Sequence, residues 1–351
     1  MMLAAGAAAA VGCDQGVQHD DRVVGPPVRV VGTNLGMGGA PKGAIAANGA
    51  LEIAFDRVLD PASLNRQAAV IIRVGGGPIA NPAVAYDPVT RVLRLSAANE
   101  SGAPWLTPGQ PYELILTDPN EPNSIGGVRA LDGATIDHAG PRRIAFFASD
   151  ELPKDALLAR GIDPVMDFCR DVLPIFRAKC AGSACHGEPG TTAGLVLTSA
   201  AGVANTALRR AAIEANTGSR AGLGGTPGRV FGVDLPVIEP GNPAASWLMY
   251  KLLLAVPADD VDGGAVATAA RCDGAPGPAP TPPRLPLAPF AALDSAERTR
   301  FADAMLGSPM PYPARPGVLD REQNLTLSEL ERVRAWIAQG AQISECGACV
   351  Q

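Results

Sequence analysis

The sequence of 351 residues has no excess of basic charge, few aromatic residues and little histidine. Lysine and arginine number 29 against 35 acidic residues, so no basic stripe is present to neutralise phosphates, and we expect no nucleic-acid binding. Aromatic residues make up 4% of the chain. No apolar run approaches the ~18 residues that a transmembrane helix needs. The 40 glycines and 33 prolines predict abundant loops, and the length suggests about two domains.

The first residues form an alanine-rich apolar segment that ends just before Cys13. Residues 1–12 resemble a bacterial export signal, and the small residues before Cys13 resemble a lipoprotein cleavage site. We therefore expect Cys13 to become a lipid-bearing N-terminus and residues 13–27 to form a polar tether. This predicts a lipid-anchored protein of the bacterial cell envelope, on its periplasmic or outer-membrane face. The alternative is an alanine-rich disordered tail, since no lysine or arginine precedes the apolar run.

The seven cysteines favour an oxidising compartment. If Cys13 carries lipid, and Cys180 and Cys185 serve one shared site, four cysteines remain, which is enough for two disulfides. These disulfide candidates are Cys169, Cys272, Cys346 and Cys349. The last two either close on each other or reach separately to the first two, and sequence alone does not decide. A zinc site is disfavoured because His19 and His138 do not fall at ligand spacing from these thiols.

Residues 28–149 show short apolar or alternating runs separated by turn residues. The expected strands are 28–32, 51–55, 70–74, 92–95, 112–116 and 143–147. Repeated strands at such spacing predict an antiparallel β-sandwich.

Two segments of this region, 53–63 and 106–114, are similar to the bacterial Ig-like domains of exported surface proteins. The resemblance implies an all-β sandwich with the tyrosine of the second segment inward, and a spacer or adhesive role. Asp132, Asp137 and His138 suggest either a metal site or a solvated loop, and we favour the loop.

After Asp150 the pattern becomes helical. Apolar residues recur at helical spacing over 163–179 and predict a helix there. Asp163 is expected as its N-cap and Pro164 in its first turn, and Pro174 is expected to kink or break it. A second helix is expected over 246–254, and a third begins at a capping box whose first residue is Thr326 and ends near Gly340. Residues 255–289 are rich in proline, glycine and alanine and read as a long insertion.

A short loop holds the chemistry of this second region, because Cys185 is followed directly by His186 and preceded by Cys180. Such a run predicts covalent haem attachment, in which two sulfurs add to the haem vinyl groups and the imidazole binds the iron. Four residues separate the cysteines instead of the usual two, and the flexible Gly182 allows the extra length to bulge. The alternatives are a Cys180–Cys185 disulfide without haem, or a zinc or redox-thiol site. A catalytic cysteine with His186 as its base is disfavoured, because sequence neighbours seldom orient as a nucleophile pair.

A second axial ligand is expected from Met310, which lies in a stiff, proline-flanked loop. Thioether ligation opposite histidine raises the reduction potential, which suits an electron carrier. The alternative is a loop methionine that only packs, with Met305 and Met249 as substitutes in expected helices.

The order of segments over about 165–343 is similar to the cytochrome c-like domains of planctomycete and myxobacterial exported proteins. The matching segments are 172–176, 180–187, 194–198, 239–252, 310–311 and 327–341. The resemblance implies a mainly α haem domain with His186 as proximal and Met310 as distal ligand. It also implies that the C-terminal helix with Trp336 packs against the helix before Cys180.

Together these observations predict a multidomain chain with an Ig-like sandwich at 28–149 and a cytochrome c-like domain at 150–351. The expected function is a mono-haem c-type cytochrome that transfers single electrons to a partner protein of the envelope, and not an enzyme. The alternative is a haem-free structural or adhesive surface lipoprotein stabilised by disulfides.

Overall fold

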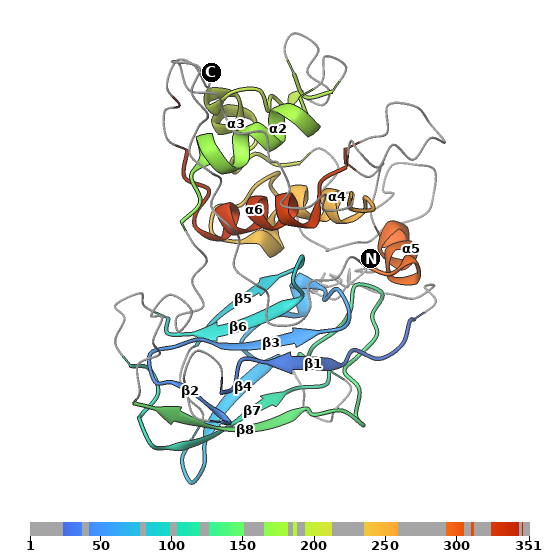
Figure 1. Ribbon diagram of the computed structural model, residues 1–351. Helices are drawn as coiled ribbons and strands as arrows, with labels where there is room; N and C mark the ends of the chain where they lie inside the picture. The colour runs from blue at the N-terminus through green and yellow to red at the C-terminus, as the bar shows by residue number, and fades with distance from the viewer. Residues whose placement is uncertain are drawn as a thin grey trace, which may run out of the picture.

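In the computed structural model, the described part of the chain forms two layers, a pair of β-sheets and a group of helices (Figure 1). The described residues are 24–36, 42–77, 82–98, 104–119, 126–150, 165–181, 185–187, 194–212, 235–258, 293–304, 310–311, 324–343 and 346. The predicted signal segment, Cys13 and most of the tether and insertion therefore lie outside the described residues. Within the described residues, no helix is long and apolar enough to span a bilayer.

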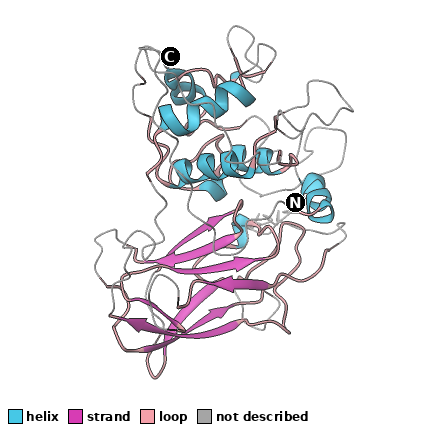
Figure 2. Ribbon diagram, in the orientation of Figure 1, coloured by secondary structure: helices cyan, strands magenta, loops and turns pink. Residues whose placement is uncertain are grey.

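The described residues include eight strands, which form two four-stranded sheets that face each other (Figure 2). The first sheet has the order β1-β3-β6-β5, and the second has the order β2-β8-β7-β4. The strands are β1 Val30–Thr33, β2 Ala44–Ala46, β3 Leu51–Phe55, β4 Ala69–Arg73, β5 Ala83–Asp87, β6 Val92–Ser96, β7 Pro111–Leu116 and β8 Arg143–Ser149. The six strands expected from the sequence are all present, with bounds shifted by at most two residues at either end.

The prediction of a fully antiparallel sandwich was wrong at one pair, because β2 runs parallel to β8. Strands β2 and β5 were not expected. All other neighbouring strands are antiparallel, with Tyr112 opposite Phe146 between β7 and β8. The side chain of Tyr112 is buried, and its hydroxyl accepts a hydrogen bond from the amide of Thr107 at 2.8 Å.

The first sheet is covered on both faces at its strand β3. In β3 the apolar Leu51, Ile53 and Phe55 join the core between the sheets, while Glu52 and Ala54, on the opposite face, are buried as well. A strand that is buried on both faces requires a second layer against the sheet. The helices supply that layer, with α4 (Trp247–Leu253) and α6 (Leu327–Ala338) nearest to β5 and β6 in Figure 1.

The helical layer begins with a π-helical turn, η2 (Phe168–Val172). It leads directly into α2 (Leu173–Lys179), whose second residue is Pro174. Proline lacks an amide hydrogen, which the first turn of an α-helix does not need, so Pro174 starts α2 and marks the break that the sequence predicted. Asp167 caps η2 through a 2.8 Å hydrogen bond from the amide of Arg170. The expected cap, Asp163 with Pro164, lies outside the described residues.

The remaining helices include two that the sequence predicted and two that it did not. The helical elements are η1 Pro61–Ser63, η2 Phe168–Val172, α2 Leu173–Lys179, α3 Ala200–Thr206, η4 Pro243–Ala245, α4 Trp247–Leu253, α5 Ser295–Ala304 and α6 Leu327–Ala338. The capping box at Thr326 is confirmed, since its hydroxyl accepts from the Glu329 amide at 3.1 Å and its own amide donates to the Glu329 carboxylate at 2.9 Å. Gly340 follows α6 with a φ of 94°, as its role as a helix stop requires.

The two layers share their apolar cores. Val58, Val89 and Leu131 of the β-sheet region belong to the apolar cluster of the helices, whereas Ala244 of η4 belongs to the cluster between the sheets. The helices therefore pack directly on the sandwich, without a spacer between the two.

Candidate functional site

The loop with the paired cysteines starts at the C-terminal end of α2. The amide of Cys180 donates to the carbonyl of Phe176 at 2.8 Å, and Cys180 is the C-cap residue of α2. The amide of His186 then donates back to the carbonyl of Cys180 at 3.1 Å. The carbonyl of His186 accepts from the amide of Leu197 at 2.8 Å. Backbone hydrogen bonds thus bring Cys180, Cys185 and His186 together, although residues 182–184 lie outside the described part.

The two cysteines of this loop carry free thiols in different surroundings. Cys180 is 7% exposed and belongs to the helical apolar cluster, whereas Cys185 is half-buried. Burial away from water raises the pKa of the Cys180 thiol to about 12, with the neighbouring Cys185 adding to the effect. At neutral pH Cys180 is therefore a neutral thiol, unsuited to nucleophilic attack.

The expected second ligand of the iron, Met310, packs against the apolar cluster to which Cys180 belongs. Its amide donates to the carbonyl of Lys251, at the middle of α4, at 3.0 Å. The residue is half-buried, and the peptide bond to Pro311 is cis. Of the two substitutes, Met249 is fully buried in the core, and Met305 lies outside the described residues.

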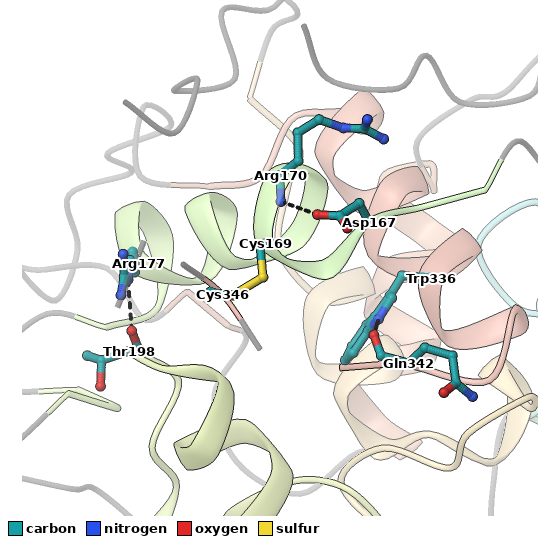
Figure 3. Close-up of a disulfide and its surroundings, with 8 residues drawn as sticks. All are labelled: Asp167, Cys169, Arg170, Arg177, Thr198, Trp336, Gln342 and Cys346. Carbon is teal, nitrogen blue, oxygen red and sulfur yellow. Dashed lines mark hydrogen bonds between the residues drawn. A yellow bond between two sulfur atoms is a disulfide. The ribbon is translucent and has the colours of Figure 1, made fainter. Parts of the chain in front are cut away.

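Aromatic side chains join the helix before Cys180 to the C-terminal helix. Trp336 of α6 lies 5.2 Å from Phe168 and 6.2 Å from Phe176, measured between ring centroids. Its indole nitrogen donates to the carbonyl of Gln342 at 2.9 Å, which satisfies the one polar atom of the buried ring (Figure 3). The expected packing of Trp336 on the helix before Cys180 is present.

A disulfide joins the same two parts of the chain. Cys169 of η2 is bonded to Cys346, and the two bridge 177 residues of sequence (Figure 3). This is one of the pairings that the sequence left open. Cys272 and Cys349, the other two candidates, lie outside the described residues. A bond between Cys180 and Cys185 is not formed.

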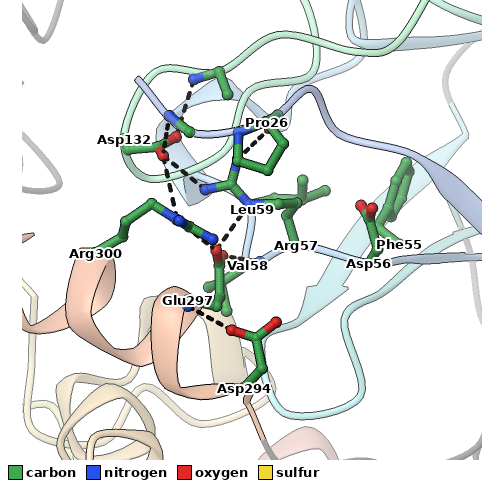
Figure 4. Close-up of polar contacts among 12 residues, drawn as sticks. Pro26, Phe55, Asp56, Arg57, Val58, Leu59, Asp132, Asp294, Glu297 and Arg300 are labelled. Atoms are coloured by element: carbon green, nitrogen blue, oxygen red, sulfur yellow. Dashed lines mark hydrogen bonds and ion pairs between the residues drawn. The ribbon is translucent and has the colours of Figure 1, made fainter. Parts of the chain in front are cut away.

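A second polar cluster lies between the sandwich and α5, and the sequence did not indicate it (Figure 4). Arg57 directs its Nε to the Glu297 carboxylate at 2.8 Å and a terminal nitrogen to the Asp132 carboxylate at 2.7 Å. Arg300 of α5 lies 3.1 Å from Glu297 and 3.8 Å from Asp132. We call these four residues the interlayer ion cluster.

The interlayer ion cluster corrects one expectation for the loop that contains Asp132. The solvated-loop interpretation was wrong for this carboxylate, which is buried and paired with Arg57. Asp137 pairs with Arg29 at 3.0 Å, and His138 contacts the buried Asp118. Among the described residues, no group of three or more His, Cys, Asp or Glu side chains is placed to hold a metal ion.

Comparisons with known proteins add little to this picture. No protein-family model matches the chain, and no curated protein does. The bacterial S-layer protein SbsC is 11% identical over 41% of this chain and 16% of its own, with a TM-score of 0.26. The E. coli alpha-2-macroglobulin is 15% identical over 37% of this chain and 6% of its own, with a TM-score of 0.25. The chain spans a small part of both proteins, and likeness at this level carries no argument about function.

Proposed function

We propose that the chain is a mono-haem c-type cytochrome of the bacterial envelope, in which an Ig-like sandwich supports a cytochrome c-like helical domain. The observation that carries the proposal is the backbone closure of the loop, which places two unpaired thiols and His186 together at the end of α2. Thioether attachment needs free sulfurs, and these two are free, whereas Cys169 and Cys346 of the same helical layer are bonded to each other.

The residues around the loop suit a haem group. Cys180 and Met310 border one apolar cluster, and a dry apolar surrounding is what tunes the potential of a bound haem. Cys180 and Cys185 would hold the porphyrin through its vinyl groups, with His186 and Met310 as the axial ligands. When bound, the haem iron would supply one-electron chemistry, cycling between its ferric and ferrous states.

The protein's own contribution would be to hold the ligands and exclude water. The hydrogen bonds from His186 to Cys180 and from Leu197 to His186 restrain the proximal loop. The hydrogen bond from the amide of Met310 to the carbonyl of Lys251 restrains the segment that would supply the second ligand. The raised pKa of Cys180 argues against a redox-active or catalytic thiol at this position.

The predicted lipid anchor at Cys13 and the partner protein belong to the same proposal. A carrier held at a membrane by lipid would exchange electrons with another envelope protein. The haem-free alternative, a structural or adhesive lipoprotein, is favoured by one observation, since the Cys169–Cys346 disulfide and the shared core stabilise the helical layer without any cofactor.

Covalent attachment is tested by expressing the mature chain in a host with cytochrome c maturation machinery. We expect haem that remains with the polypeptide through denaturing electrophoresis, and a reduced-minus-oxidised spectrum of a c-type centre. The variant with Cys180→Ala and Cys185→Ala is the matched control, and no haem should remain with its polypeptide on the denaturing gel. A colourless wild-type protein with Cys180 joined to Cys185 would contradict the proposal and favour the haem-free alternative.

The distal role of Met310 is tested by Met310→Ala. We expect a lower reduction potential and an iron that binds external ligands, because the thioether that stabilises the ferrous state is removed. Met249→Leu, at a fully buried methionine of α4, is the control and should leave both properties unchanged. If Met310→Ala leaves the axial spectroscopy unchanged, the distal ligand is another residue.

A further inference from the structure

We infer that Arg57, a residue of the sandwich, is a positioning residue for the methionine segment of the helical layer. Through Glu297 it fixes α5, the helix after which the chain reaches Met310. An effect of Arg57 on electron transfer rests on the proposed function, whereas its effect on the position of Met310 does not require haem.

The first step is the buried attachment of α5 to the sandwich. The side chains of Arg57 and Glu297 are 5% and 7% exposed. Arg57 also donates to the carbonyl of Pro26, and Glu297 accepts from the amide of Val58 at 3.1 Å. One carboxylate of α5 is thus bound by both the side chain of Arg57 and the backbone of the next residue. A bidentate attachment of this kind fixes orientation as well as distance.

The second step is that the described part of this helix has few apolar side chains with which to pack. Residues 295–304 contain one large apolar side chain, Phe301, among mostly polar and small residues. Phe301 is buried and lies 6.0 Å from the ring of Tyr250 in α4, measured between centroids. Leu293, two residues before the helix, is also buried in the helical apolar cluster. These two apolar contacts set where α5 lies, and the ion pairs to the sandwich add the directional contacts that apolar packing does not supply.

The third step connects α5 to Met310. The helix ends at Ala304, six residues before Met310, so the connection spans at most about 20 Å. The amide of Met310 binds the carbonyl of Lys251, the residue that follows Tyr250. The helix α5 therefore touches α4 next to the point where α4 holds Met310. A shift of α5 would act on Met310 along the chain and through α4.

The charges favour a positioning role over simple stabilisation. Buried ion pairs contribute little net stability, because desolvation offsets their attraction, but they discriminate strongly between correct and shifted arrangements. In the interlayer ion cluster, Arg57 and Asp132 come from the sandwich, and Glu297 and Arg300 from α5. Each layer has an ion pair of its own, Arg57–Asp132 and Glu297–Arg300, and the buried Arg57–Glu297 pair joins the two. A displaced α5 would lose that joining pair while both internal pairs remain.

Amide hydrogen exchange of the full chain without haem tests the positioning directly. We expect Arg57→Met to accelerate exchange at the Met310 amide roughly tenfold, while exchange at Leu93 in the central strand β6 stays unchanged. The control is Arg143→Met, which removes an exposed arginine paired with Glu113 on the other sheet and should change neither. Acceleration at Met310 and Leu93 alike would reduce Arg57 to general stability and overturn the inference, as would no change at Met310.

Glu297→Gln is the second variant and serves where Arg57→Met does not fold. It keeps the size of the side chain and removes its charge, and we expect the same selective acceleration at Met310. In the haem-loaded protein both variants should weaken the absorption of the methionine–iron bond and lower the reduction potential. If wild-type protein takes up no haem, the proposed function fails, yet the exchange comparison still decides the role of Arg57.

Discussion

Among single residues, the two free cysteines differ most clearly in their surroundings. Cys180 is buried with a pKa raised to about 12, and Cys185 is half-buried. At pH 8 a thiol with that pKa is thiolate to roughly one part in ten thousand. In the haem-free native protein we expect iodoacetamide to label Cys185 at least a hundredfold faster than Cys180, measured by mass spectrometry of the peptides. Equal rates would contradict the burial of Cys180, and equal labelling in denaturant is the control.

A second residue-scale prediction concerns Asp132 and acid stability. Burial alone would raise the pKa of Asp132, but hydrogen bonds from Arg57 and from the amides of Ala134 and Gly25 outweigh it, so the pKa is lowered. A carboxyl whose pKa is lowered by folding stabilises the protein above its unfolded pKa of about 3.9 and loses that contribution as pH falls. We expect Asp132→Asn to cost about 2–3 kcal/mol at pH 7 and progressively less as pH falls toward and through the lowered pKa of Asp132.

Denaturant titrations of wild type and Asp132→Asn at pH 7, 5 and 3 measure this difference. Asp87, whose pKa is raised by burial, has the opposite pH dependence, but it is present in both proteins and cancels in the comparison. A difference between the two proteins that is independent of pH would show that Asp132 contributes nothing through its charge.

At the scale of elements, the disulfide fixes the helix before Cys180 to the segment after α6. Cys169 and Cys346 are 177 residues apart, and closing so large a loop restricts the unfolded chain strongly. We expect Cys169→Ser with Cys346→Ser to lower the free energy of unfolding by about 2–5 kcal/mol, measured by chemical denaturation. Cys185→Ser keeps the disulfide and should change stability little. An equally small loss in both proteins would refute the structural role of the bond.

The sequence predicted the elements whose residues carry a strong local pattern. The alternation in β3 and β7, the capping box before α6 and the break at Pro174 depend on neighbouring residues, and all three are present. Strand β5 was missed because alanine and aspartate give a weak strand signal, and β2 because it has three residues. Helix α5 has no apolar stripe, so periodicity could not reveal it.

The candidate site, like the fold, was predictable where its residues are neighbours in sequence. Cys180, Cys185 and His186 are adjacent in sequence and stay together, which local spacing could show. The interlayer ion cluster could not be predicted, because Arg57 and Glu297 are 240 residues apart and each alone resembles an ordinary surface charge. The Cys169–Cys346 pairing was left open for the same reason, since connectivity depends on distances in space.

At the scale of the whole molecule, the shared core predicts cooperative unfolding. Val89 and Leu131 of the sandwich pack into the helical cluster, and Arg334 of α6 pairs with Asp87 of β5 at 3.0 Å. We expect a single calorimetric transition in which the van 't Hoff and calorimetric enthalpies agree. The double variant Val89→Ala and Leu131→Ala weakens the interface and should separate the sandwich and helical transitions. Two transitions in wild-type protein would show that the layers are independent.

The disulfide between Cys169 and Cys346 also imposes an order on the maturation of the newly made chain. Cys169 must wait for 177 more residues before its partner is synthesised, while Cys180 and Cys185 emerge soon after it. In an oxidising compartment, which the proposed export of the chain implies, the first thiols that Cys169 could meet are therefore those of Cys180 and Cys185, and neither is its partner. A bond formed early between Cys169 and either of these thiols would have to be reshuffled, which takes seconds to hours. We therefore expect the yield of native protein to depend on thiol–disulfide isomerase activity in the producing cell.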